Sequence, residues 1–143
     1  METKEKHFSC CERVLMSTEE VLRLPEFHRY VKMASGFGGG VSGRGSICGA
    51  ISGAVMALDL KYGTDGIEDY EEFNEKRIVL RKITQRFMRD FENEFRAVNC
   101  SDLLGNDPWT EEGKTSIEEL RKVGKTHWTK YVDWASKRVC QLL

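Results

Sequence analysis

Apolar residues recur at steps of three and four positions along most of this chain, and this spacing limits the fold more than any other feature. Side chains with that spacing share one face of an α-helix. The alternation of apolar and polar residues that is typical of a half-buried strand forms no clear run, and only two prolines interrupt the chain. The sequence therefore predicts an all-α protein.

Capping and turn residues place the predicted helices. Ser9 and Glu12 match a capping box that opens a helix running to about Leu24, and Pro25 suits the first turn of a second short helix. Gly49, Gly53 and Ala57 then form a stripe of small residues, along which another backbone can approach closely. Further helices are predicted over about 46–62, 68–98, 99–104 and 116–142, the last with a kink at Gly124.

The 143 residues contain no repeat and no linker long enough to divide them, so we expect one domain over residues 1–143. Glycines crowd segment 35–45, which we call the glycine loop, and they exclude a regular element there. The predicted architecture is a single-domain helical bundle with this glycine-rich loop before the central helix.

Charge and hydropathy exclude two classes of partner. The 22 basic and 23 acidic side chains leave a net charge of −1, whereas nucleic-acid binders usually carry a basic surface. The most apolar stretch, 47–60, is shorter than the roughly 20 residues of a membrane span. The start of the chain is polar and carries no apolar run of signal-peptide length. We expect a cytoplasmic protein that binds neither nucleic acid nor membrane.

Five cysteines are the main chemical signal, because thiols in a reducing compartment more often serve catalysis or metal binding than permanent disulfides. Cys10, Cys48 and Cys100 each fall in the first turn of a predicted helix. Free amide groups and the helix dipole favour an anion there, and they lower the pKa of a thiol. These three are the candidate catalytic residues, while Cys11 and Cys140 read equally well as small core residues.

Two other kinds of site were considered. Gly38, Gly40 and Gly43 match the spacing of a dinucleotide fingerprint, but the preceding segment is predicted to be helix rather than strand. We expect the amides of Gly38, Gly39 and Gly40, with Arg44, to stabilise a thiolate or hold a small anion; a flexible surface connection is the alternative. His7, His28 and His127 are isolated, and no paired-cysteine zinc motif is present.

Four segments together are similar to one family. They are residues 9–15 with Cys10, residues 34–40 with the glycine run, residues 48–54 with a Cys-Gly-Ala-x-x-Gly box, and residues 98–105 with Asn-Cys-x-x-Leu-Leu-Gly. The combination resembles the redox-active proteins named for the pattern C–GCAxxG–C–C, over nearly the whole chain. The resemblance implies a small helical cytosolic protein whose widely spaced cysteines perform thiol redox chemistry.

Cys10, Cys48 and Cys100 correspond to the first three family cysteines. Where the resemblance implies a fourth, this chain has His127 and Trp128, and Cys140 follows about one helical stretch later. Either Cys140 or His127 is therefore a candidate for the fourth position.

Three functions follow from these residues. In the first, Cys48 attacks a disulfide and Cys10 or Cys100 resolves the mixed species, in exchange with an unidentified redox partner. In the second, the same three cysteines bind zinc or an iron–sulfur cluster together with His127 or Cys140. In the third, the glycine loop and Arg44 bind a small anion without catalysis. The sequence leaves open whether the chain is an enzyme and whether it forms a homodimer.

Overall fold

The structure is a computed structural model of the chain and describes residues 5–105 and 128–143. Within these ranges the chain forms helices and one isolated antiparallel bridge, with no β-sheet, so the predicted all-α class is confirmed. The helices are α1 (Cys10–Ser17), α2 (Glu19–Leu22), α3 (His28–Met33), α4 (Gly49–Tyr62), α5 (Tyr70–Phe95), α6 (Cys100–Leu104) and α8 (Thr129–Leu142).

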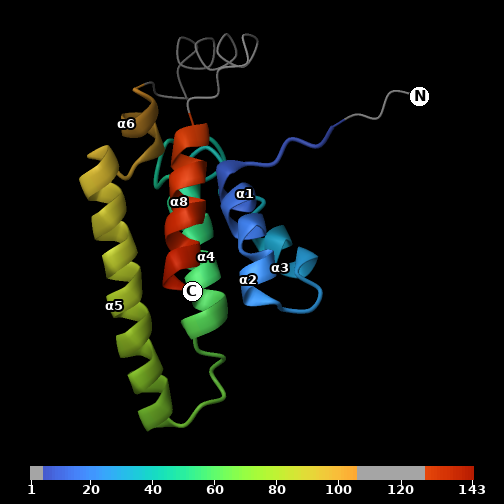
Figure 1. Cartoon of the computed structure of the whole chain (residues 1–143), viewed down its shortest axis with the longest axis vertical. Helices are drawn as coiled ribbons and strands as arrows, with labels where there is room; N and C mark the ends of the chain where they lie inside the picture. Colours follow the sequence, from blue (N-terminus) through green and yellow to red (C-terminus); the bar gives the residue numbers. More distant parts are fainter. Residues whose placement is uncertain (1–4, 106–127) are drawn as a thin grey trace.

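Three helices run in the same direction. Figure 1 shows α1, α4 and α8 side by side with their first residues at one end of the bundle, while α5 runs alongside them in the opposite direction. The starts of α1, α4 and α8 therefore lie at the same end as α6 and the glycine loop. Parallel neighbours need long connections, and here these are the segments that precede α4 and α8.

The core lies where the apolar faces of α1, α4, α5 and α8 meet. Phe87 and Phe91 of α5 are fully buried. Phe91 packs edge-on to Trp134 with ring centroids 5.5 Å apart, and the ring of Phe95 lies 4.8 Å from that of Tyr131. These aromatic contacts fix α8 against α5, and thereby position the first turn of α8 beside α6.

Several predicted boundaries are corrected. The first helix ends at Ser17 rather than near Leu24, where buried Thr18 turns its hydroxyl back to the carbonyl of Leu15 at 2.6 Å. The helix that Pro25 was expected to open begins only at His28, after Glu26 with a positive φ of 53°. The other described helices fall within their predicted ranges, and residues 116–127, with the predicted kink at Gly124, lie outside the described residues.

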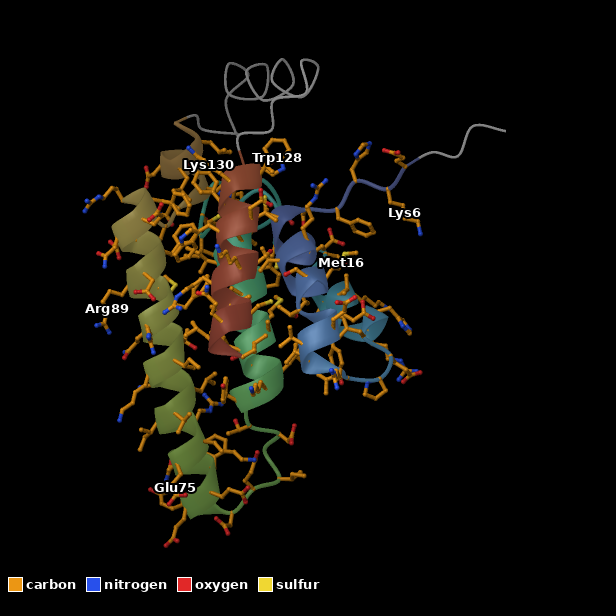
Figure 2. All side chains as sticks on the ribbon, in the orientation of Figure 1. Lys6, Met16, Glu75, Arg89, Trp128 and Lys130 are labelled. Atoms are coloured by element: carbon orange, nitrogen blue, oxygen red, sulfur yellow. The ribbon has the colours of Figure 1, made fainter. Side chains whose placement is uncertain are left out.

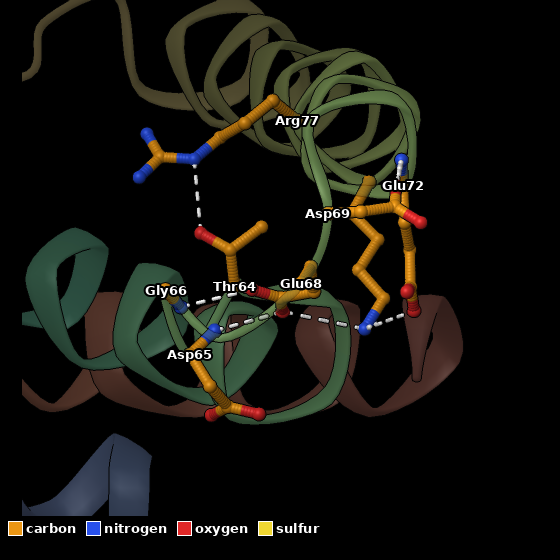
Figure 3. A network of polar contacts seen from close by, with 8 residues as sticks. Thr64, Asp65, Gly66, Glu68, Asp69, Glu72 and Arg77 are labelled. Atoms are coloured by element: carbon orange, nitrogen blue, oxygen red, sulfur yellow. Dashed lines mark hydrogen bonds and ion pairs between the residues drawn. The ribbon is translucent and has the colours of Figure 1, made fainter.

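A polar network closes the turn between α4 and α5 (Figure 3). The carboxylate of Glu68 accepts the amides of Asp65 and Gly66, each at 2.9 Å, and Lys76 lies 3.4 Å from it. Arg77 donates to the hydroxyl of Thr64 at 3.1 Å. We call residues 63–69 with this network the turn end of α4.

Among the described residues, no helix is both long and apolar enough to cross a bilayer.

Candidate functional site: three thiols at one end of the bundle

Cys10 is placed by the predicted capping box at the start of α1. Ser9 accepts the amide of Glu12 through its hydroxyl at 3.4 Å, and the Glu12 carboxylate accepts the amide of Ser9 at 3.1 Å. This reciprocal pair satisfies two amides that a helix start leaves unbonded. Cys10 is therefore fixed as the first residue of α1.

Cys48 and Cys100 are brought together by the isolated bridge between Ile47 and Asn99. The amide of Cys48 donates to the carbonyl of Val98 at 2.8 Å, and the amide of Cys100 donates to that of Ser46 at 2.6 Å. Successive side chains of extended backbone point to opposite faces. The two cysteines each follow a paired residue, so their side chains lie on one face of the bridge as diagonal neighbours.

Small residues on α4 bring Cys10 to the same place. A Cβ added at Gly49 would lie only 3.2 Å from the Cβ of Cys10, and one at Gly53 only 2.4 Å from the carbonyl oxygen of Cys11. The backbones of α1 and α4 thus touch along the glycine stripe that the sequence predicts. Cys10 and Cys48 consequently lie at the starts of two helices that are in close contact.

The glycine loop is folded tightly against these cysteines and is not a loose surface connection. A Cβ at Gly38 would lie 2.5 Å from the Cβ of Ser9, and one at Gly40 would lie 2.8 Å from the Cβ of Cys100. Gly40 also has a φ of +72°, which L side chains rarely adopt. Amides 41–46 donate to carbonyls within the loop or just before it. The density of glycine here therefore reflects close packing.

A pocket of about 830 Å³ adjoins the three thiols. Cys10, Cys48 and Cys100 all line it, so the structure brings the three candidate catalytic residues together. Gly38 and Gly39 also line it. Arg44 is exposed and does not belong to the pocket lining, whereas Arg13 of α1 does. We call this cavity the thiol pocket.

The other wall of the thiol pocket comes from residues that the sequence analysis did not single out for a site. Trp128 lies at the start of α8, at the same end of the bundle as the start of α1 (Figure 2). The hydroxyl of Tyr131 donates to the carbonyl of Leu103 at 2.8 Å and holds α6 against α8. Trp128 and Tyr131 lie on an apolar stripe, which predicts that they pack in the core. Nothing in the local sequence indicates that they also border a cavity. The remaining large side chains of the lining are His7, Phe8, Glu12 and Leu104.

Burial raises the pKa of every pocket thiol, which contradicts the lowered pKa that the sequence predicts at helix starts. Burial, with the negative charges that Cys48 and Cys100 would carry, raises the pKa of Cys10 to about 12 although Arg13 opposes this. Burial and the nearby Cys48 raise the pKa of Cys100 to about 11. Burial also raises the pKa of Cys48, and the amides of Ala50 and Ile51 offset only part of the effect. Desolvation thus outweighs the helix amides.

The remaining cysteines serve the core or lie elsewhere. Cys11 is fully buried, and its sulfur contacts that of Met56 at 3.9 Å. Cys140 contacts the carbonyl of Ser17, the last residue of α1, and so lies at the other end of α1 from Cys10. It therefore cannot complete a set of ligands with the pocket thiols in this arrangement. All five cysteines are free thiols.

The described part of the chain contains no cluster of side chains arranged to bind a metal ion. No three His, Cys, Asp or Glu side chains within residues 5–105 and 128–143 are placed to hold one metal ion. His127, the other candidate for the fourth ligand, lies outside the described residues.

Comparison with known proteins identifies the family of this chain. Searches of the curated proteins and of the solved structures find no match to this chain. A family model described as "Putative redox-active protein (C_GCAxxG_C_C)" matches residues 8–140, a range that includes all five cysteines. The chain therefore belongs to the C_GCAxxG_C_C family of redox-active proteins.

Proposed function

We propose that the protein performs dithiol–disulfide exchange, with Cys48 as the thiol that pairs alternately with Cys10 and with Cys100. One observation carries the proposal: three free thiols that are far apart in sequence line one pocket. Cys48 lies diagonal to Cys100 across the bridge, and the residue after it, Gly49, packs against the Cβ of Cys10, so Cys48 is a near neighbour of both.

Exposure divides the roles among the three thiols. Cys48 is only 4% exposed, whereas Cys10 and Cys100 are half-buried. An external disulfide reaches the half-buried thiols first, which makes Cys48 the resolving thiol and not the attacking thiol of the sequence-based prediction. Of the two, Cys100 lies diagonal to Cys48 across the bridge, so a mixed disulfide formed at Cys100 lies next to the resolving thiol.

The exchange proceeds in two balanced steps. The thiolate of Cys100 attacks one sulfur of a disulfide RS–SR, forms a mixed disulfide and releases RS⁻. Cys48 then attacks the Cys100 sulfur, forms the internal disulfide and releases the second RS⁻. The protons of the two protein thiols end on the two released RSH molecules, and the protein is oxidised by two electrons. Diagonal neighbours lie roughly 7 Å apart, so closure needs a small movement toward the 4.4–6.8 Å usual between Cα atoms.

Mapping of disulfides after oxidation of the reduced protein by a small disulfide RS–SR tests the proposal. The wild-type protein is expected to lose two hydrogens and to yield peptides linked through Cys48 to Cys10 or Cys100. Cys48→Ser should abolish the internal link and leave a stable mixed disulfide at Cys100 or Cys10. Cys140→Ser is the matched control and should behave as wild type, because Cys140 lies away from the pocket. An internal disulfide that persists in Cys48→Ser would refute the shared role of Cys48.

Binding of zinc or an iron–sulfur cluster by the same thiols is the competing proposal. Elemental analysis of protein purified without oxygen distinguishes it, since stoichiometric zinc or iron would favour a metal role over exchange. The expected result is a metal content well below one atom per chain, with the three pocket thiols free to react.

A further inference from the structure

The thiol pocket has the size of a site for a small molecule. Its volume of about 830 Å³ falls within the roughly 300–1,000 Å³ typical of such sites. Phe8, Leu103, Leu104, Trp128 and Tyr131 contribute apolar surface to its lining. A concave site with an apolar wall and a few polar groups suits a compact ligand better than the surface of a folded protein.

The polar groups of the pocket favour a negative charge. The first residues of α1 and α4 line it, and the starts of both helices carry partial positive charge. The amides of Gly38 and Gly39, also in the lining, donate to no acceptor among the described residues. Arg13 lies close enough to favour the thiolate of Cys10.

The acidic member of the lining is engaged in the cap of α1. The carboxylate of Glu12 accepts the amide of Ser9 at 3.1 Å and belongs to the capping box of α1. His7, Arg13 and Tyr131, whose hydroxyl donates to the carbonyl of Leu103, are the other titratable groups of the wall besides the thiols. The pocket therefore offers unpaired N–H donors and a guanidinium beside three sulfur atoms.

We infer that the substrate of the thiol exchange is a low-molecular-mass disulfide that carries carboxylate groups. This inference rests on the proposed function. The carboxylates bind Arg13 and the amides of Gly38 and Gly39, and the disulfide lies against Cys10 and Cys100. Exchange then reduces the substrate to two thiols and leaves the protein with the internal disulfide through Cys48.

Three small disulfides of different charge test the inference on the full-length reduced protein. The probes are oxidised glutathione with its carboxylates, cystamine with two ammonium groups, and the neutral bis(2-hydroxyethyl) disulfide. The rate of internal disulfide formation is measured for each and divided by the rate of dithiothreitol with the same probe, which removes intrinsic reactivity. We expect the corrected rate for oxidised glutathione to exceed that for cystamine at least tenfold at low salt and to approach it at high salt.

Arg13→Gln should lower this ratio about fivefold, as expected for the loss of one charge at the surface of a pocket. The ratio is compared within each variant, so a general change in thiol reactivity cancels. Arg81→Gln, which removes an exposed charge from α5, is the matched control and should leave the ratio unchanged.

Two results separate failure of the inference from failure of the proposed function. Equal corrected rates for all three probes, with the internal disulfide formed, would overturn the substrate class and keep the exchange. If a disulfide in a folded protein oxidises the pocket thiols faster than any small probe does, the proposed substrate class is also overturned. If no probe produces an internal disulfide, the exchange itself is refuted.

Discussion

The pKa shifts of titratable side chains have opposite directions at the two ends of helix α4. At the thiol pocket, burial raises the pKa of Cys10 to about 12 and that of Cys100 to about 11. At the turn end, the side chain of Glu68 is only 4% exposed, yet its pKa is lowered to about 2. The amide of Asp65 is the largest cause, followed by the amide of Glu68 itself; burial opposes them, and the amide of Gly66 and the side chain of Lys76 add to the lowering.

The difference teaches that hydrogen-bond donors aimed at the charged form, more than burial, decide the sign of a pKa shift. Glu68 has such donors and closes a turn, while the pocket thiols have few and remain neutral next to a cavity. The effects on stability follow with opposite signs. The contribution of Glu68 is present above pH 4.5 and is lost as the pH falls toward 2. That of Cys10 is present below pH 9 and is lost as the pH rises toward 12.

The largest predicted effect concerns the reactivity of the pocket thiols. With pKa values of about 11 and 12 in place of 9.0, the thiolate fractions of Cys100 and Cys10 at pH 7.5 fall roughly 100-fold and 1,000-fold. Alkylation by iodoacetamide, followed by peptide mass analysis, should be slower by these factors in the native protein than in urea. The rate should rise about tenfold per pH unit up to pH 11. A plateau below pH 8 would contradict the raised pKa and restore the thiolate that the sequence predicts.

The second prediction breaks the close contact of α1 with α4. In Gly53→Ala, the new methyl group would lie 2.4 Å from the carbonyl oxygen of Cys11, so α1 must move away from α4. We expect a loss of about 1–3 kcal/mol in the free energy of unfolding, measured in urea. Gly36→Ala is the matched control, because its methyl group would meet only the Ser42 hydroxyl at 3.9 Å. Equal stability of the two variants would show that the glycine stripe does not set this packing.

The third and smallest effect tests the turn end. Glu68→Gln removes the charge that accepts two amides, so its melting temperature at pH 7 should lie below that of wild type. The two curves should converge as the pH falls from 4.5 to 2, because wild-type Glu68 is then protonated. Glu75→Gln replaces an exposed carboxylate on α5 and serves as control. A constant difference between wild type and Glu68→Gln at all pH values would refute a role for the charge.

Much of the local structure around the thiol pocket can be predicted from the sequence. The capping box at Ser9 and Glu12 and the small stripe at Gly49 and Gly53 are both predicted, because each depends on residues within one or two helical turns. The proximity of Cys48 to Cys100 is not predicted, because a bridge of one residue pair leaves no periodic pattern in the sequence. The resemblance to a family indicated that Cys48 and Cys100 act together, but not how they are arranged.

Local sequence alone determined the helical class, the start of α1 at its capping box and the placement of Cys10, Cys48 and Cys100 at helix starts, because these depend on neighbouring side chains and caps. Tertiary structure decided which thiols meet, that Arg13 and not Arg44 borders them, and that their pKa values rise. Each of these depends on how much water the packed helices exclude from a given atom. That exclusion is set by residues far apart in the chain, such as Cys10, Cys100 and Trp128.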